Sequence, residues 1–422
     1  MPSHNPKRGQ HKAQGEQEKR NLANQSWSDK INQAIDDLAI NRTSVREEAL
    51  DSLISGLLRH YAAEVIEPRN EELLILLKRS LSKGGSQRES CLAANAIALA
   101  FVNHGDMSLG EEEDLYQVIL PTLKATLSNS TDITIKSNCI QTMALITFIA
   151  ASDIDTQLVR NYLYDIIETE GEGLDTEGLS TQDIDQLLSA ALRAYGLLYI
   201  SSFSEGILQS DVIWEEIEKV MPLHEMLLES SDKDVRVAAG ENIAVMFEIM
   251  RICVDLEDED EEFDEEAEQY PEYDNMDGLL YTLKQLSVES GRRQTKSDRA
   301  EQKSVFRDVT KSVEEGIKPV EELKISGKVI TFRGWSKILV LNAFRRSIGQ
   351  GLQQHFKTND LLRQIFHFSG RFSTQNTTDD DDDEEKHYLD DLSKVDKHYV
   401  YEERDKARSK QLRIARNGKD RA

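Results

Sequence analysis

The feature that most constrains the fold is a helical pattern that recurs between about residues 28 and 251. A helix with a leucine-rich face is followed by a short polar break and then by a second helix rich in small residues. Four of these second helices stand out, and they begin at Val45, Gln87, Ile135 and Val235. Their starts are 42, 48 and 100 residues apart, and 100 is close to two repeats of 50, so a fifth second helix is expected near 183–200.

One helix pair is too small to bury its own apolar face, whereas stacked pairs share a continuous core. A two-helix period of 42–50 residues is typical of armadillo and HEAT repeats. It predicts an all-α, armadillo/HEAT-like α-solenoid of about five units, with an irregular helical bundle as the alternative. We expect the loop Gly171–Gly178 to break the array. Each clear second helix opens with a basic residue, namely Arg46, Arg88, Lys136 and Arg236.

A second block spans about 275–370, and the sequence predicts a small, mostly helical C-terminal domain there. Alternation of apolar and polar residues at Leu323–Phe332 predicts a short hairpin. We expect this block to dock on the end of the array and cap it. Helices are expected at Asp277–Glu289, Gln294–Glu315 and Trp335–Ile348, followed by a short helix through Phe366 that Thr358, Asn359 or Asp360 would cap.

The net charge of −26 is concentrated in two acidic runs. Residues 255–268 hold eleven carboxylates, and residues 379–385 hold seven more. Such runs repel themselves and favour solvated linkers, with binding of basic partners as the alternative. We therefore predict disordered charged segments between folded parts: a basic arm at 1–25, helical repeats at 26–251, an acidic linker at 252–274, the C-terminal domain at 275–370, an acidic linker and connector at 371–403, and a basic tail at 404–422.

The basic tail reverses the sign of the charge, with a local net charge of +6 between residues 404 and 421. On a helix several of these cations share one side, which suits contacts with nucleic-acid phosphates that depend on charge and shape. A solvated tail or a nuclear import signal is the alternative. We also expect the run at 379–385 to pair with the tail when no partner is bound. The predicted nucleic-acid or ribosome contacts are Arg404, Lys406, Arg408, Lys410, Arg413 and Arg416.

The sequence lacks the signatures of catalysis and of cofactor or metal binding. Gly349-Gln350-Gly351 lacks the third glycine of a dinucleotide loop, and His224-Glu225 lacks the second histidine of a zinc-binding helix. We therefore expect no enzymatic activity, no cofactor and no small-molecule substrate. The N-terminus has no apolar segment typical of a secretory signal, and no apolar stretch reaches the roughly 20 residues that span a membrane. A membrane partner is therefore not expected.

Four stretches of the chain are distinctive: VRVAAGENIAVMFEIMR at 235–251, QKSVFRDVTKSVEE at 302–315, the region from Trp335 to Phe366, and KARSK at 406–410. Together they resemble the interferon-related developmental regulator family. The SVFRDV stretch is quite specific, whereas the helical repeats alone would be a weak signal. The family-motif residues are Ser304, Val305, Phe306, Arg307, Asp308, Val309 and Trp335.

The apolar residues of the motif, Val305, Phe306 and Val309, are expected to bury one face of a helix. Arg307 and Asp308 either pair locally or meet a partner, and the sequence leaves both open. A further basic patch precedes the motif and consists of Arg292, Arg293, Lys296 and Arg299.

The resemblance implies an armadillo-like N-terminal domain, a smaller C-terminal domain and no enzymatic activity. It also implies control of gene expression, either by ribosome binding that silences translation or by transcriptional co-regulation through protein partners. Our leading hypothesis is a scaffold that represses translation by binding a ribosome or another ribonucleoprotein, with protein partners on the solenoid surface. The alternative is a nuclear protein–protein adaptor. We expect the protein in the cytoplasm, with the nucleus as a second location.

Overall fold

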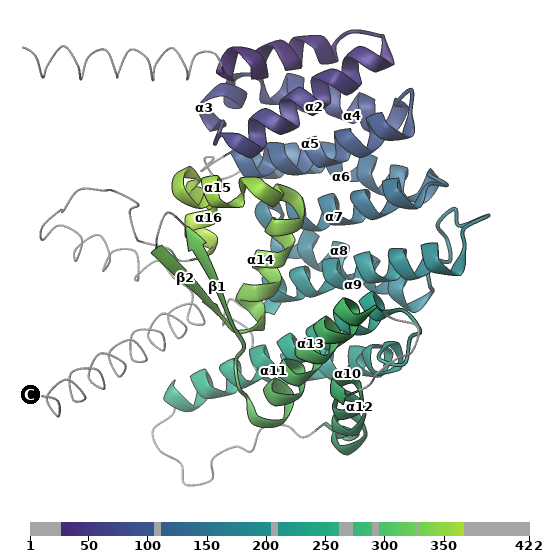
Figure 1. Ribbon diagram of the computed structural model, residues 1–422, viewed down its shortest axis with the longest axis vertical. Helices are drawn as coiled ribbons and strands as arrows, with labels where there is room; N and C mark the ends of the chain where they lie inside the picture. The colour runs from purple at the N-terminus through teal and green to yellow at the C-terminus, as the bar shows by residue number, and fades with distance from the viewer. Residues whose placement is uncertain are drawn as a thin grey trace, which may run out of the picture. The chain divides into compact units, whose positions relative to one another are not determined.

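The computed structural model describes residues 27–104, 111–203, 210–260, 273–288, 295–325 and 328–366. These residues form stacked helices and one two-stranded sheet (Figure 1). The predicted all-α solenoid class is therefore confirmed. Contacts divide the chain into two compact units, of which the first comprises Met1–Ala150 and Phe344–Leu362 and the second comprises Ala151–Ala343 and Arg363–Ala422. The domain boundaries expected from the sequence remain predictions.

The first unit begins with helix pairs whose second members pack on one another. Helix α2 packs on α5, and α5 packs on α7, while the first helices α4 and α6 form a parallel layer of contacts. A helix at 27–38 precedes α2. The elements are α2 (Thr43–Arg59), α3 (Ala63–Ile66), η1 (Glu67–Arg69), α4 (Asn70–Lys83), α5 (Gln87–His104), α6 (Glu111–Asn129) and α7 (Ile133–Ala150).

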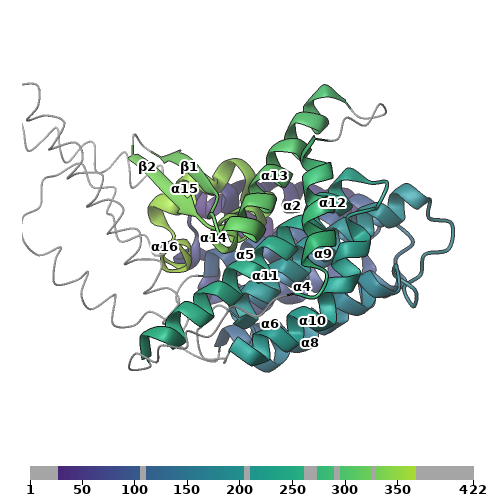
Figure 2. The same cartoon turned by 90° about the horizontal axis from the view of Figure 1, so that it is seen from below.

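The second unit repeats the arrangement. Helix α9 packs on α11, and α11 packs on α13, with α8, α10 and α12 as the respective first helices. The pair α12–α13 thus stacks on α11 as one more helix pair (Figure 2). The elements are α8 (Asp153–Glu168), α9 (Thr181–Phe203), α10 (Ser210–Leu227), α11 (Lys233–Asp260), α12 (Met276–Val288) and α13 (Lys296–Glu315).

All five predicted second helices are present, including the fifth, which is α9. The expectation that Gly171–Gly178 breaks the array is wrong. This loop joins α8 to α9, and the two helices pack along each other as an ordinary pair. Its three glycines, at 171, 173 and 178, have positive φ angles. Glycine adopts this backbone region without steric cost, so the glycines mark a turn inside a pair.

Three of the predicted basic residues occupy the fourth position of a second helix and are buried: Arg46, Lys136 and Arg236. Each donates a hydrogen bond to a carbonyl at or just past the end of the preceding first helix, where carbonyls lack a helical partner. A cation there also complements the negative end of the helix dipole. The accepting oxygens belong to Ile40, Leu127 and Ser230, at 3.1, 2.7 and 2.6 Å.

Arg88 differs from these three residues. It occupies the second position of α5, because that helix begins at Gln87. This position lies on another face of the helix, and the Arg88 side chain is 62% exposed and paired with Asp51.

Small polar side chains join neighbouring second helices within each unit. Each donates to a backbone carbonyl of the preceding second helix, which requires the two backbones to approach closely. The small residues in these helices permit that approach. The bonds run from Asn103 to Leu57 at 3.2 Å, from Thr142 to Ala94 at 3.0 Å and from Asn242 to Leu192 at 3.0 Å.

The segment 344–362 belongs to the first unit and includes the end of α14 (Trp335–Ile348), η2 (Gly349–Gly351) and α15 (Leu352–Thr358). His355 Nε2 donates to the carbonyl of Leu57 at 2.8 Å, and Asn359 Nδ2 donates to that of Val102 at 2.8 Å. Both acceptors lie in the last turns of second helices, where carbonyls lack helical partners. The segment therefore crosses the C-terminal ends of α2 and α5. Within the block that we expected to dock on the end of the array, α12–α13 stacks on α11, whereas this segment packs on α2 and α5.

The predicted hairpin is confirmed, with β1 (Val320–Ile325) antiparallel to β2 (Lys328–Arg333) and Leu323 opposite Ile330. The short helix predicted to end near Phe366 is α16 (Asp360–Ile365), and Asn359 Oδ1 accepts a hydrogen bond from the Leu362 N–H at 3.4 Å. Phe332 and Phe366 then meet edge to face at 5.3 Å.

Helix α7 is the one helix in the described ranges that is long and apolar enough to cross a membrane. In the structure 61% of that stretch is buried, and α7 packs against α5 and α6. A second helix is covered by its own first helix and by a neighbouring pair, so it carries apolar residues on all sides.

Candidate functional site

The structure describes one of the two groups of predicted site residues. The family motif Ser304–Val309 lies in the middle of α13, and Trp335 is the first residue of α14, both in the second unit. The basic tail residues Arg404, Lys406, Arg408, Lys410, Arg413 and Arg416 lie outside the described residues, and their role remains a prediction.

The apolar residues of the motif attach α13 to α11. Phe306 and Val309 are fully buried, whereas Val305 is half-buried. The Phe306 ring lies against Gly240 of α11, where an added Cβ would come within 2.8 Å of the ring edge. Phe306 therefore requires a glycine at position 240. Packing against α11 explains why the SVFRDV pattern contains this phenylalanine.

Trp335 lies where three elements of the second unit meet. Its backbone N–H donates to Glu248 Oε2 at 2.7 Å, and the N–H and hydroxyl of Ser336 both donate to Glu248 Oε1 at 3.0 Å. The buried carboxylate of Glu248, on α11, thus satisfies the free N–H groups at the start of α14. Gly334 has a φ of 91°, and an added Cβ there would lie 2.8 Å from the same carboxylate.

The indole of Trp335 also reaches α13. Its Nε1 donates to the hydroxyl of Ser312 at 2.8 Å. Arg251 of α11 donates to the carbonyls of Ser312 and Val313, in the last turn of α13. Gly316 then ends the helix in the left-handed conformation that commonly terminates helices. The motif residues and their partners therefore hold α11, α13 and α14 in one fixed arrangement.

Sequence reasoning missed Glu248 and Arg251. Trp335 and Glu248 are 87 residues apart, so no local pattern connects them. The available signal was the Gly-Trp-Ser order before an apolar helix, since a glycine there predicts a special backbone angle and the serine a helix start. It pointed to a helix boundary without naming the carboxylate.

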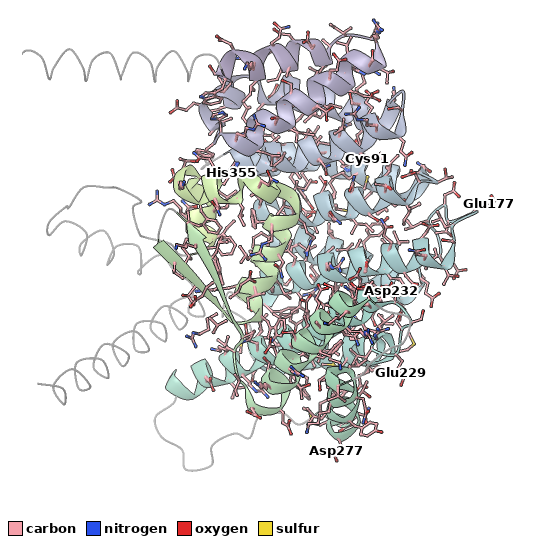
Figure 3. The ribbon with its side chains drawn as sticks, in the orientation of Figure 1. Cys91, Glu177, Glu229, Asp232, Asp277 and His355 are labelled. Carbon is pink, nitrogen blue, oxygen red and sulfur yellow. The ribbon has the colours of Figure 1, made fainter. Side chains whose placement is uncertain are left out.

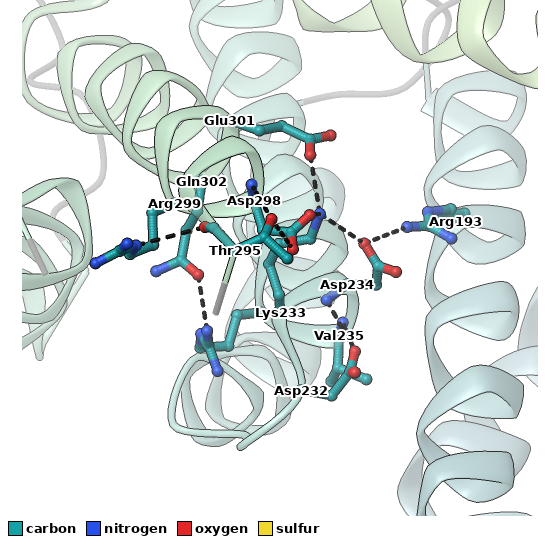
Figure 4. A network of polar contacts seen from close by, with 11 residues as sticks. Arg193, Asp232, Lys233, Asp234, Val235, Thr295, Asp298, Arg299, Glu301 and Gln302 are labelled. Carbon is teal, nitrogen blue, oxygen red and sulfur yellow. Dashed lines mark hydrogen bonds and ion pairs between the residues drawn. The ribbon is translucent and has the colours of Figure 1, made fainter. Parts of the chain in front are cut away.

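A second polar network joins the N-terminal ends of α11 and α13 (Figure 4). Lys233 Nζ contacts Glu301 at 2.8 Å, Asp298 at 3.3 Å and Asp234 at 3.7 Å. Burial alone would lower the pKa of Lys233, but its hydrogen bond to Glu301 and the nearby carboxylates outweigh burial and raise that pKa. Next to this network, Arg236 donates to Gln302 at 2.7 Å.

Two carboxylates of α13 that belong to this network lie on the same side of the helix. In Figure 4 Asp298 and Glu301 point toward Lys233, whereas Arg299 points the other way. At about 100° per residue, the cations of α13 fall within an arc of about 120°, and Asp298 and Glu301 fall on the opposite side. Asp308 lies about 60° from Lys311, and Glu314 lies within the arc. The cations are Lys296, Arg299, Lys303, Arg307 and Lys311. We call the four spaced four residues apart (Arg299, Lys303, Arg307 and Lys311) the α13 cationic row.

The two ends of the row differ in their contacts. Arg299 Nε lies 3.4 Å from the carbonyl of Thr295. Arg307 and Lys311 are exposed, and neither side chain makes a hydrogen bond or ion pair with another described residue. Of the two alternatives for the motif, local pairing of Arg307 with Asp308 is therefore absent from the described structure. Glu314, which follows the row, pairs with Lys284 of α12 at 2.7 Å.

The charge of the chain is divided along its length. Residues 27–288 hold 52 acidic and eighteen basic side chains, whereas residues 295–366 hold eight acidic and fourteen basic ones. Some of these acidic residues lie in the loops that join helices of the second unit, where Figure 3 labels Glu177, Glu229 and Asp232. The block that carries the family motif therefore has a net charge of +6 in a chain whose net charge is −26.

Titratable groups in the described ranges do not gather into a metal site, since no cluster of three or more metal-binding side chains occurs there. Burial lowers the pKa of His104 and of His224 to about 4, so both are neutral at pH 7. His60 stacks on Trp27 at 4.4 Å, and His355 is the buried donor described above, labelled in Figure 3. His60 and His355 therefore have structural roles.

Comparison with known proteins identifies relatives along most of the chain. A family model described as interferon-related developmental regulator (IFRD) matches residues 3–314. Interferon-related developmental regulator 2 of Mus musculus is 29% identical over 345 residues, which are 81% of this chain and 73% of that protein. Interferon-related developmental regulator 1 of Rattus norvegicus is 28% identical over 341 residues, covering 78% and 69%.

A fungal relative covers still more of the chain. An uncharacterised protein of Schizosaccharomyces pombe is 24% identical over 410 residues, which are 92% of this chain and 87% of that protein. The family match ends at residue 314, so it includes the SVFRDV motif and all but the last residue of α13, but not Trp335.

Proposed function

The chain belongs to the interferon-related developmental regulator family, and we propose that it regulates gene expression as a non-catalytic scaffold that represses translation by binding the ribosome. Stacked helix pairs supply an extended surface for large partners. The cationic C-terminal part supplies contacts with ribosomal RNA, which is a dense array of negative charge.

The observation that carries this proposal is the division of charge. The chain as a whole is strongly acidic and would be repelled by RNA at long range. Its C-terminal part nevertheless contains two cationic regions, the block 295–366 and the tail 404–421, each with a net charge of +6. Two cationic regions in an acidic chain favour a polyanionic partner that is bound at one end of the sequence.

In the proposed mechanism the tail, as a helix, contacts phosphates and blocks a functional channel of the ribosome. Such contacts release counterions and depend on charge and shape rather than base sequence. If the tail makes about five phosphate contacts, the logarithm of the affinity falls with the logarithm of the salt concentration with a slope between about −3.5 and −4.5.

The test is co-sedimentation with ribosomes in sucrose gradients, using the full chain and a variant that ends at residue 400. We expect the full chain to travel with ribosomes at low salt and the shortened variant to bind them much more weakly. Co-sedimentation that is undiminished by removal of the tail would refute the tail's role. Absence of the full chain from ribosomal fractions at low salt would refute the proposal itself.

A second candidate function is a nuclear adaptor for transcription, and exposed apolar side chains favour protein partners of this kind. Ile154 and Leu158 lie one turn apart on α8 and are 72% and 57% exposed, and Val212 of α10 is also exposed. On this hypothesis the basic tail is an import signal. Loss of nuclear localisation on removal of 404–421, without ribosome binding by the full chain, would favour it.

A further inference from the structure

We propose that the α13 cationic row is a second RNA-binding surface, which contacts phosphates independently of the tail. This inference rests on the proposed function, because it assigns a further surface to the same ribonucleoprotein partner. It concerns described residues, whereas the tail lies outside them.

The geometry of the row suits a repeating polyanion. Residues four apart on a helix are about 6 Å apart along its axis, so the four cations span about 18 Å. They drift slowly around the helix and stay within one side of it. A row of evenly spaced cations can follow consecutive phosphates of one strand, whereas a single acidic side chain of a protein would meet only one of them.

The row is also unfavourable for the folded chain by itself. Like charges four residues apart destabilise a helix. Arg307 has Lys303 and Lys311 as its neighbours four residues away, and Ser304 and Thr310 three residues away, so its own helix offers it no carboxylate. Asp298 and Glu301 contact Lys233 of α11. Local repulsion of the kind that surrounds Arg307 is expected at functional surfaces.

The row is held in place before any partner binds. Thr295 caps the start of α13 by accepting a hydrogen bond from the Asp298 N–H at 3.1 Å, and Gly316 ends the helix. Phe306, about 100° around the helix from Arg307, is buried against Gly240. Binding therefore orders only the tips of side chains, which lowers its entropic cost.

The chemistry of the row indicates contacts with the sugar–phosphate backbone. Arginine and lysine neutralise phosphates, whereas reading a base also needs aromatic or amide side chains beside them. The row contains neither. We therefore expect binding to RNA of any sequence, with a strong dependence on salt.

The experiment replaces Arg307 and Lys311 with glutamine in the full chain, since glutamine keeps helix propensity and length while removing charge. The matched control replaces Arg59 and Lys83 with glutamine. These two are also exposed, lie on α2 and α4, and make no hydrogen bond or ion pair with other described residues. Binding to a labelled duplex RNA is followed by fluorescence anisotropy between 50 mM and 200 mM salt, and ribosome co-sedimentation is measured alongside.

We expect the Arg307/Lys311 variant to bind the duplex roughly tenfold more weakly at 50 mM salt, with a salt slope smaller by about 1.4 to 1.8. The control should match the wild type. Equal binding by the Arg307/Lys311 variant and the wild type would overturn the inference and leave the proposed function intact. Ribosome binding that needs the pair while duplex binding does not would also overturn it, because the row would then meet an acidic protein.

A full chain that binds neither ribosomes nor duplex RNA at 50 mM salt would overturn both proposals together. Repeating the measurement in the variant that ends at residue 400 separates the two surfaces. We expect the Arg307/Lys311 replacements to weaken binding there as well. If the tail alone accounts for binding, the replacements change nothing in either background, and the row is not an RNA-binding surface.

Discussion

The guanidinium of Arg46 on α2 donates two hydrogen bonds to the carboxylate of Glu89 on α5, at 2.6 and 2.9 Å. Both side chains are buried, and the bond joins two neighbouring helix pairs of the first unit. Burial by itself would raise the pKa of Glu89, but the bonds from Arg46 and from the Gly85 N–H outweigh it and lower that pKa. The folded unit therefore holds Glu89 as a carboxylate.

Replacing Arg46 with methionine is expected to destabilise the first unit by about 3 to 5 kcal/mol, because it leaves a buried carboxylate without its cation. The double replacement Arg46→Met and Glu89→Leu should cost less than the two single changes together. Chemical denaturation measures both. The control is Arg88→Gln, which breaks an exposed pair with Asp51 and should change stability by less than about 1 kcal/mol.

A larger side chain at Gly240 is expected to be destabilising, since even a Cβ would overlap the Phe306 ring. Overpacking of this kind costs about 1 to 3 kcal/mol. Gly240→Ala should therefore lower the unfolding midpoint, and Phe306→Leu should recover part of the loss by making space. A double-mutant cycle tests the contact; additive effects of the two changes would contradict direct packing between them.

The start of α14 offers a third prediction. Glu248→Gln keeps the shape of the side chain but removes the charge that accepts from Trp335 and Ser336, and it should lower stability by about 1 to 3 kcal/mol. Increased amide exchange at Trp335 and Ser336 is the direct measurement. Glu241→Gln, on the same helix, serves as the control and should leave exchange at these two amides unchanged.

The fold was predictable to the extent that it depends on local patterns. Second helices carry small and apolar residues on all sides, so α9 could be placed from the repeat length alone. Docking of the 275–370 block on the end of the array was expected, but the contact between α13 and α11 was not predictable, because it depends on Gly240 facing Phe306 across 66 residues of sequence. The acidic run at 255–268 obscured it further, since α11 continues to Asp260 and includes the first residues of that run.

The candidate site, like the fold, was only partly predictable from the sequence. The cations of α13 and their spacing are visible in the sequence, but the contacts of Asp298 and Glu301 depend on Lys233, which lies on α11. Sequence reasoning left Arg307 between two alternatives for this reason. A pattern along one helix gives the direction of a side chain, and only the neighbouring helices decide whether a carboxylate reaches it.

Deleting 379–385 is expected to strengthen RNA binding. The deletion removes seven carboxylates that precede a tail with a net charge of +6, and unlike charges in one chain compete with an external polyanion. The measurement is the dissociation constant for duplex RNA at low salt. Replacing the same seven residues with glycine and serine controls for the shortened linker, and unchanged affinity in both variants would refute pairing between the run and the tail.

The buried His224 predicts how stability in the second unit depends on pH. Its Nδ1 donates to the carbonyl of Val220 at 2.9 Å, and its Nε2 accepts from Asn242 at 3.3 Å, so the neutral ring satisfies both partners. Burial lowers the pKa of His224 to about 4, below the value of about 6.5 in the unfolded chain. Between these values the unfolded state binds the proton more readily, so stability is fully present above about pH 6.5 and falls as the pH drops toward 4.

The loss at pH 4 is roughly 3 kcal/mol. His224→Gln should flatten the profile of stability against pH in this window while lowering stability at neutral pH. An unchanged slope between pH 6.5 and 4 in that variant would show that other groups, such as His104 in the first unit, account for the acid sensitivity.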